Sequence, residues 1–153
     1  MPIVQTLTNT FKVDLLSGGA NFNTTNRALS SNTQDVFKIA LYSSLANLDA
    51  TTTAYTTTDE ISGTGYVAGG LTLTISQIPV TGATPTTTAY INFADAVWTP
   101  AAFSAAGALI YNSSYSNRSV AVLSFGGVKT AANNIFKVVF PPPGVGSSII
   151  QIA

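Results

Sequence analysis

The fold is decided by the stretch at residues 36–42, Val36-Phe37-Lys38-Ile39-Ala40-Leu41-Tyr42. Within it, Phe37, Ile39 and Leu41 alternate with residues that are smaller or more polar. A period of two is typical of a half-buried β-strand. We therefore expect one face of this strand to enter a hydrophobic core.

A long threonine-rich segment follows, from Leu48 to Ser62. It is too polar to be buried and too poor in helix formers to predict a helix. We expect a surface loop, and a connection this long in a compact domain is usually functional or disordered.

The next residues, Gly63-Thr64-Gly65-Tyr66-Val67-Ala68, match the G-x-G-x-x-A form of the dinucleotide-binding fingerprint. That fingerprint works only where a helix follows the glycines. Here Gly69, Gly70 and an alternating segment follow. We interpret the glycines as residues that let the loop fold back and start the next strand.

Alternation or β-rich composition predicts further strands at 71–78, 89–94, 102–111, 119–125, 135–140 and 149–152. The polar turn between the third and fourth of these predicts a hairpin. Gly107 indicates a bulge or a close backbone contact, and Gly126-Gly127 is expected to end the strand before it. Trp98 is expected to fill one edge of the core.

The amino-terminal part differs from the rest. Thr8 or Asn9 can cap a helix at residues 9–17, and Gly18-Gly19 supplies its end. We expect its buried side to be formed by Phe11, Val13, Leu15 and Leu16. Residues 1–8 are short and uncharged, and they predict an arm that needs a partner surface to be ordered.

These elements predict a mainly β fold, an antiparallel β-sandwich that is jelly-roll-like or Ig-like, with one short N-terminal helix. The length of 153 residues fits one domain. We expect residues 1–8 to be an N-terminal arm and residues 9–153 to form a single β-sandwich domain.

Composition favours a protein that works in an assembly. Charged residues make up 8% of the chain, its formal net charge is zero, and 46% of its residues are hydrophobic. With so little charge repulsion, such chains tend to associate. The six basic residues form no basic stripe, so we expect no nucleic-acid partner. No apolar run is long enough to predict a membrane span, and no signal peptide is evident.

The inventory of reactive side chains is small. Histidine and cysteine are absent, which excludes Ser-His-Asp relays, thiolate nucleophiles and histidine metal sites. We expect no catalytic residues, no cofactor and no metal. One alternative stays open: Asp49 and Asp95 could approach Asp59 and Glu60 and form an oxygen-ligand calcium site.

Binding surfaces favour tyrosine, which offers a large contact area at low entropic cost. Several tyrosines lie at or near predicted loops. The candidate partner contacts are three apolar residues of the arm and three loop tyrosines: Ile3, Val4, Leu7, Tyr55, Tyr66 and Tyr115.

The order and spacing of five blocks resemble a family of small virion structural proteins of tailed bacteriophages and prophages. These blocks lie at residues 37–42, 48–55, 60–66, 107–112 and 121–126. In that family a short helical segment like Asn9-Thr10-Phe11-Lys12 precedes the first strand, and the chain ends in an apolar strand like that at 149–153. The loop at 21–34 and the run Pro141-Pro142-Pro143 differ from the family pattern, and we expect particle-specific contacts there.

The resemblance implies a non-enzymatic component of the virion, made in the host cytoplasm. The first hypothesis is a capsid decoration or cement protein, a homotrimer that contacts the major capsid protein and bridges capsid subunits. The second is a tail, neck or fibre subunit whose loops contact the host surface and other tail proteins. A third is a glycan-binding or glycan-cleaving module.

Overall fold

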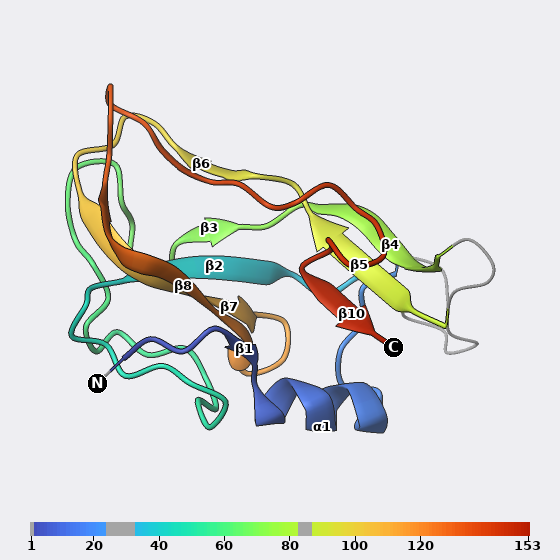
Figure 1. The fold of residues 1–153 in the computed structure, drawn as a ribbon. Helices are drawn as coiled ribbons and strands as arrows, with labels where there is room; N and C mark the ends of the chain where they lie inside the picture. The colour runs from blue at the N-terminus through green and yellow to red at the C-terminus, as the bar shows by residue number, and fades with distance from the viewer. Residues whose placement is uncertain (1, 24–32, 83–86) are drawn as a thin grey trace.

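The stretch at residues 36–42 forms β2 (Phe37–Tyr42) in the largest sheet (Figure 1). The structure is a computed structural model and describes residues 2–23, 33–82 and 87–153. The other elements, in chain order, are β1 (Thr6–Leu7), α1 (Asn9–Ser17), β3 (Leu71–Thr72), β4 (Ile75–Thr81), β5 (Ala89–Phe93), β6 (Ala96–Trp98), β7 (Ser104–Asn112), β8 (Arg118–Thr130), β9 (Phe136–Val138) and β10 (Ile150–Ile152).

Within those described ranges the strands form three sheets. The five-stranded sheet has the order β1-β8-β7-β2-β3, the three-stranded sheet the order β10-β5-β4, and β6 pairs with β9. All of these pairs are antiparallel. The prediction of a mainly β, antiparallel fold with one short N-terminal helix is therefore confirmed.

Strand β2 is buried on both faces, whereas its alternation predicted burial of one. Phe37, Ile39 and Leu41 belong to the main core, as expected. Ala40 and Tyr42 on the other face are also fully buried, with 0% exposure each, and belong to a second core. The period of two located the strand correctly but did not reveal that its other face is covered.

The segment between β2 and β3, residues 43–70, covers that second face. It forms no helix or ladder strand, as expected for a loop, and most of its threonines are exposed. Ala46 and Leu48, however, are only 1% and 3% exposed and pack in the second core. The expectation that the segment from Leu48 is too polar to be buried is wrong for Leu48, because its apolar side chain turns inward while the threonines face solvent.

The strand expected at 71–78 divides between two sheets. β3 pairs with β2 in the five-stranded sheet, and β4 pairs with β5 in the three-stranded sheet. Leu73 lies between them and is buried in the main core. The alternation continues through the crossing because both sheets face the same core.

The β7–β8 hairpin is confirmed, and so is the irregularity at Gly107. The register shifts between Ala105 and Gly107, and a Cβ atom on Gly107 would lie 2.5 Å from the carbonyl oxygen of Leu123. The expected end at Gly126-Gly127 is wrong: β8 continues to Thr130, where it pairs with Ser104. Trp98 is 2% exposed in the main core, as expected.

Helix α1 has the predicted bounds. The Thr8 hydroxyl oxygen accepts a hydrogen bond from the Phe11 backbone N–H, and Gly18 ends the helix. Its buried side differs from the prediction, because Val13 and Leu16 are 57% and 91% exposed. Asp14 is buried instead, where its carboxylate pairs with the Arg118 guanidinium at 2.8 Å.

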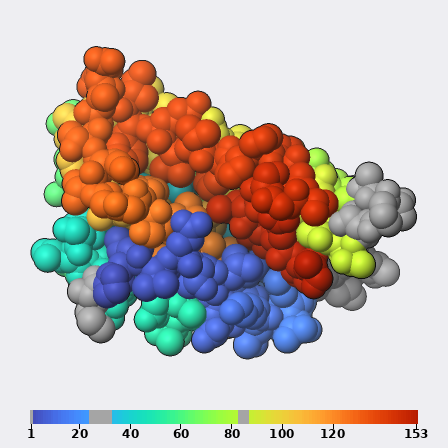
Figure 2. Space-filling model, in the orientation of Figure 1, coloured from blue at the N-terminus to red at the C-terminus, as the bar shows by residue number. Residues whose placement is uncertain are grey.

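The amino-terminal residues lie along the rest of the domain (Figure 2). Thr6 and Leu7 pair with Val122 and Ala121 of β8, and the Val4 N–H donates to the Leu48 carbonyl oxygen at 2.8 Å. The arm, which was expected to need a partner surface, is thus hydrogen-bonded to its own chain, because the β8 edge offers backbone partners to this short uncharged segment. The loop at 21–34, expected to carry particle-specific contacts, lies largely outside the described residues.

Candidate functional site

The six candidate contact residues do not form one site. Ile3 packs against the second core and Leu7 against the main core, while Val4 is 47% exposed. Tyr115 is 44% exposed in the turn between β7 and β8, and the Arg118 guanidinium carbon lies 5.3 Å from its ring centroid. The remaining two candidates, Tyr55 and Tyr66, both contact the same side chain.

That group is the carboxylate of Glu60, to which Tyr55 and Tyr66 both bind. The Tyr55 hydroxyl donates to Oε2 at 2.6 Å, and the Tyr66 hydroxyl donates to Oε1 at 2.6 Å. The Gly69 backbone N–H adds a third hydrogen bond, to Oε1 at 2.7 Å. Tyr66 also accepts the Leu41 N–H at 2.9 Å, so the carboxylate is joined to the backbone of β2.

Two further tyrosines extend this cluster. The Tyr111 hydroxyl donates to the Gly69 carbonyl oxygen at 2.8 Å, and its ring stacks on Tyr55 with centroids 4.8 Å apart. The Tyr42 hydroxyl donates to the Thr56 carbonyl oxygen at 2.6 Å. We call Glu60 with Tyr42, Tyr55, Tyr66 and Tyr111 the tyrosine network. It fastens the segment 43–70 to the five-stranded sheet.

The protonation of these hydroxyls follows from their surroundings. Burial raises the pKa of Tyr66, and its hydrogen bond to Glu60 raises that pKa further. Burial and the Glu60 charge likewise raise the pKa of Tyr111 to about 12. A tyrosine with a raised pKa keeps its proton at neutral pH. The network is therefore built from neutral hydroxyl donors around one carboxylate.

Asp49 and Asp95, the carboxylates of the calcium alternative, each have their own partner. Asp49 accepts the Thr51 N–H at 2.7 Å within its own turn, and Asp95 pairs with Lys137 at 2.7 Å. The Lys137 hydrogen bond lowers the pKa of Asp95. Among residues 2–23, 33–82 and 87–153, no group of three or more acidic, histidine or cysteine side chains could hold a metal ion. The geometry thus gives the calcium alternative no ligand set.

The glycine-rich match at residues 63–68 leads into β3, without the helix that a dinucleotide fingerprint requires. Within the match, a Cβ atom on Gly65 would lie 1.6 Å from the Pro100 carbonyl oxygen; just after it, Gly70 has a φ of +69°, and a Cβ atom there would lie 1.8 Å from the Ile39 carbonyl oxygen. No other residue could approach the β2 backbone so closely. The glycines serve the return of the chain, as the sequence indicated.

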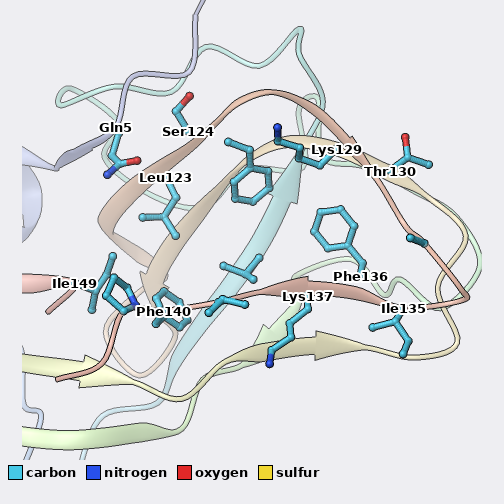
Figure 3. Close-up of a pocket in the computed structure, with 15 residues that line it drawn as sticks. Gln5, Leu123, Ser124, Lys129, Thr130, Ile135, Phe136, Lys137, Phe140 and Ile149 are labelled. Atoms are coloured by element: carbon cyan, nitrogen blue, oxygen red, sulfur yellow. The ribbon is translucent and has the colours of Figure 1, made fainter. Parts of the chain in front are cut away.

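A groove of about 470 Å³ opens on another part of the molecule, between β8 and the segment 135–141 (Figure 3). Apolar and aromatic side chains gather between the two, and Gln5 and Ile149 lie at one end (Figure 3). The apolar residues that line it are Leu123, Phe125, Ala132, Ile135, Phe136, Val138, Val139, Phe140, Pro141 and Ile149.

Both strands that border the groove have an open edge in the described part of the chain. β1 pairs with β8 only at Ala121 and Val122, so β8 beyond Val122 has only β7 beside it. β9 pairs with β6 alone. Unpaired strand edges present backbone N–H and C=O groups that another extended chain can bind.

The charge of the groove is one-sided. Its lining contains Lys129 and Lys137 and no acidic residue. Lys137 is neutralised by Asp95, and Figure 3 shows its side chain pointing away from Leu123 and Phe136. Lys129 lies on the opposite rim and forms no ion pair within the described ranges. The groove can therefore receive a carboxylate at one rim.

Neither the groove nor the role of Glu60 was predicted. One signal was present: residues 135–140 read Ile-Phe-Lys-Val-Val-Phe, in which Ile135 and Val139 are apolar on the face opposite Phe136, Val138 and Phe140. Ile135 and Val139 are 46% and 65% exposed. A strand with apolar residues on both faces indicates either burial on both sides or a contact surface.

Comparisons of the chain with protein-family models, with curated proteins and with solved structures found no match. Among the described residues, no helix is both long and apolar enough to span a membrane.

Proposed function

We propose that this chain is a non-enzymatic structural subunit of a tailed-bacteriophage virion, and within it a capsid decoration or cement protein. The sequence blocks described above resemble small virion proteins. Charged residues are 8% of the chain, and few charges on a surface favour association over free diffusion.

The observation that carries the proposal is the open groove between β8 and the segment 135–141. It is lined mainly by apolar side chains and bordered by strand edges. Ile135 and Val139 in its lining are 46% and 65% exposed. Exposed apolar surface of this kind marks contact sites on proteins. An enzyme would instead require convergent polar groups in the cleft.

For the fold itself, we infer a β-sandwich that is jelly-roll-like or Ig-like. The main core supports this, because it contains Ile39 and Ile110 from the five-stranded sheet together with Phe93 and Trp98 from the smaller sheets. Two layers of antiparallel strands around one core are the usual form of such domains.

In the proposed role the protein is a trimer in the virion and binds the major capsid protein across subunit joints. Each joint it covers buries surface that would otherwise be in water. Because a cement protein binds the assembled shell and not its separated subunits, mass action makes the shell harder to open.

The test is the number of copies per purified particle, measured by quantitative mass spectrometry against the major capsid protein. Decoration predicts hundreds of copies in a fixed ratio to the capsid subunit. Particles that lack the chain should also open at lower temperature than complete ones and should survive low ionic strength less well. If particles with and without it are equally stable, the cement role is wrong.

A tail, neck or fibre subunit is the second candidate, and Tyr115 favours it. Its ring is 44% exposed at a hairpin turn beside Arg118, a combination suited to contact with a host surface. A dozen or so copies per particle would assign the chain to the tail or neck. Absence from particles would return attention to a glycan-binding module.

A further inference from the structure

The groove between β8 and the segment 135–141 has the features of a site for one extended polypeptide segment. Its two long borders are β8, unpaired on one side beyond Val122, and β9, which within the described residues pairs only with β6. A segment lying between them could bind one or both strand edges through its own backbone, as in β-strand addition.

The floor of the groove determines which side chains such a segment carries. Phe125 and Ile149 are partly exposed within it, while Phe136 and Phe140 lie deeper, at 6% exposure each. Side chains of an extended segment alternate between two faces, so every second residue would contact this floor. Apolar side chains are needed there, since the floor offers aromatic carbon and few polar partners.

The rim of the groove determines which charge the bound segment should carry. Lys129 forms no ion pair in the described ranges, and no acidic residue lines the groove. An occupant with a carboxylate near Lys129 gains an ion pair, whereas one with a cation there is repelled. The groove volume of about 470 Å³ lies within the range of about 300–1,000 Å³ that is usual for ligand sites.

We propose that this groove binds an extended polypeptide segment that carries apolar side chains on one face and a carboxylate opposite Lys129. The identity of that segment as part of a capsid subunit rests on the proposed function; binding of the segment does not. Phe125, Phe136 and Phe140 form the apolar contact, and Lys129 selects for charge.

The experiment uses the full chain labelled with nitrogen-15 and two acetylated nine-residue peptides of alternating valine and threonine. One peptide has a central aspartate and the other a central lysine. Amide chemical shifts are followed as each is added to millimolar concentration. We expect changes confined to residues 123–141 and their neighbours, and a dissociation constant about fivefold or more lower for the aspartate peptide, the upper range for an exposed ion pair.

The variant Lys129→Glu should reverse the preference between the two peptides. The matched control is Lys12→Glu, which makes the same change on the exposed side of α1, away from the groove, and should leave both affinities unchanged. Thermal unfolding of both variants checks that each is folded.

Three outcomes would overturn the proposal: no shift changes at millimolar peptide, changes outside the groove, or equal affinity for the two peptides. Sedimentation velocity tests whether a second copy of this chain occupies the groove. A dimer that blocks binding of the aspartate peptide, and that the peptide fails to dissociate, would assign the groove to that second copy. The copy number in particles is measured independently of peptide binding. A copy number that contradicts the proposed function therefore leaves the binding result valid, and a failure of peptide binding leaves the copy number valid.

Discussion

The tyrosine network and the groove lie over different parts of the five-stranded sheet and differ in how their polar groups are satisfied. In the network, both oxygens of Glu60 accept hydrogen bonds from this chain. Along the groove, by contrast, β8 beyond Val122 and β9 each have one edge without a neighbouring strand, and Lys129 forms no ion pair, among the described residues. A carboxylate whose two oxygens are both bonded within the chain suits a surface that the chain itself closes, whereas open strand edges suit a surface that another extended molecule completes.

The largest effects are expected from core substitutions, which test whether the segment 43–70 covers the second core as tightly as the main core is covered. Leu109 and Ile110 are adjacent in β7, are both 0% exposed and belong to the second and main cores respectively. Leu109→Ala and Ile110→Ala should each lower the free energy of unfolding by about 2–5 kcal/mol. Urea denaturation measures both. A cost for Leu109→Ala far below that for Ile110→Ala would mean that the segment 43–70 covers its face only loosely.

A smaller effect is expected from Glu60→Gln. The amide keeps one acceptor oxygen, but its NH2 group cannot accept the hydrogen bond that the second tyrosine donates, and the remaining hydrogen bonds lose the charge of the carboxylate. We expect a loss of about 1–3 kcal/mol in chemical denaturation at neutral pH. Thr58→Ala, on an exposed threonine of the same segment, is the control and should change little. Equal stability of Glu60→Gln and the parent would show that the carboxylate does not hold the segment.

The same network predicts sensitivity to alkaline pH. Tyr66 and Tyr111 have raised pKa values in the folded protein, that of Tyr111 about 12 against an ordinary 10.0. The unfolded chain therefore loses these protons first. Their contribution to stability is complete below pH 10 and falls as the pH rises through the folded-state pKa values, by up to about 1.4 kcal/mol per pH unit for each hydroxyl.

Denaturation measured from pH 9 to pH 12 should thus show a declining free energy of unfolding. Tyr66→Phe should reduce the slope, because it removes one titrating group. Tyr115→Phe makes the same change at a tyrosine that is 44% exposed and outside the network, and it is the matched control. Identical slopes in all three proteins would contradict the assignment.

The smallest effect is expected at the groove. Val139 is 65% exposed, so Val139→Thr should change the free energy of unfolding by no more than about 0.5 kcal/mol. It should nevertheless weaken binding of the aspartate peptide, since a hydroxyl replaces a methyl group on the apolar lining. A large loss of stability would instead indicate that the groove belongs to the closed core of the chain.

Sequence patterns predicted the elements whose signals are local. The bounds of α1 follow from the Thr8 cap and Gly18, both of which act within one turn of the helix. The hairpin of β7 and β8 and the irregularity at Gly107 follow from a polar turn and a glycine in an apolar run. The helix cap and the hairpin turn depend on neighbours in sequence, whereas Gly107 signals its irregularity by its type but is needed because the Leu123 carbonyl oxygen of the paired strand lies so close.

The predictions that proved wrong concern residues whose burial or pairing depends on a segment distant in sequence. Leu16 fits an apolar helix side but is 91% exposed, while Asp14 is buried because Arg118, which is far away in sequence, supplies its partner. Gly126-Gly127 was expected to end a strand that continues because β7 still pairs beside it. Tyr55 and Tyr66, two of the candidate contacts, donate hydrogen bonds to Glu60, a link within the chain that their positions in predicted loops did not indicate.

By itself, the sequence determined that this protein is mainly β, that one helix precedes β2 and that few of its side chains carry charge. Those properties follow from alternation, capping and composition, which are local or summed over the chain. Only the tertiary structure decided that β2 is covered on both faces, that Glu60 closes one region and that a groove opens between β8 and β9. Covering a face requires a segment from elsewhere in the chain, and an alternating pattern records which side is apolar but not what lies against it.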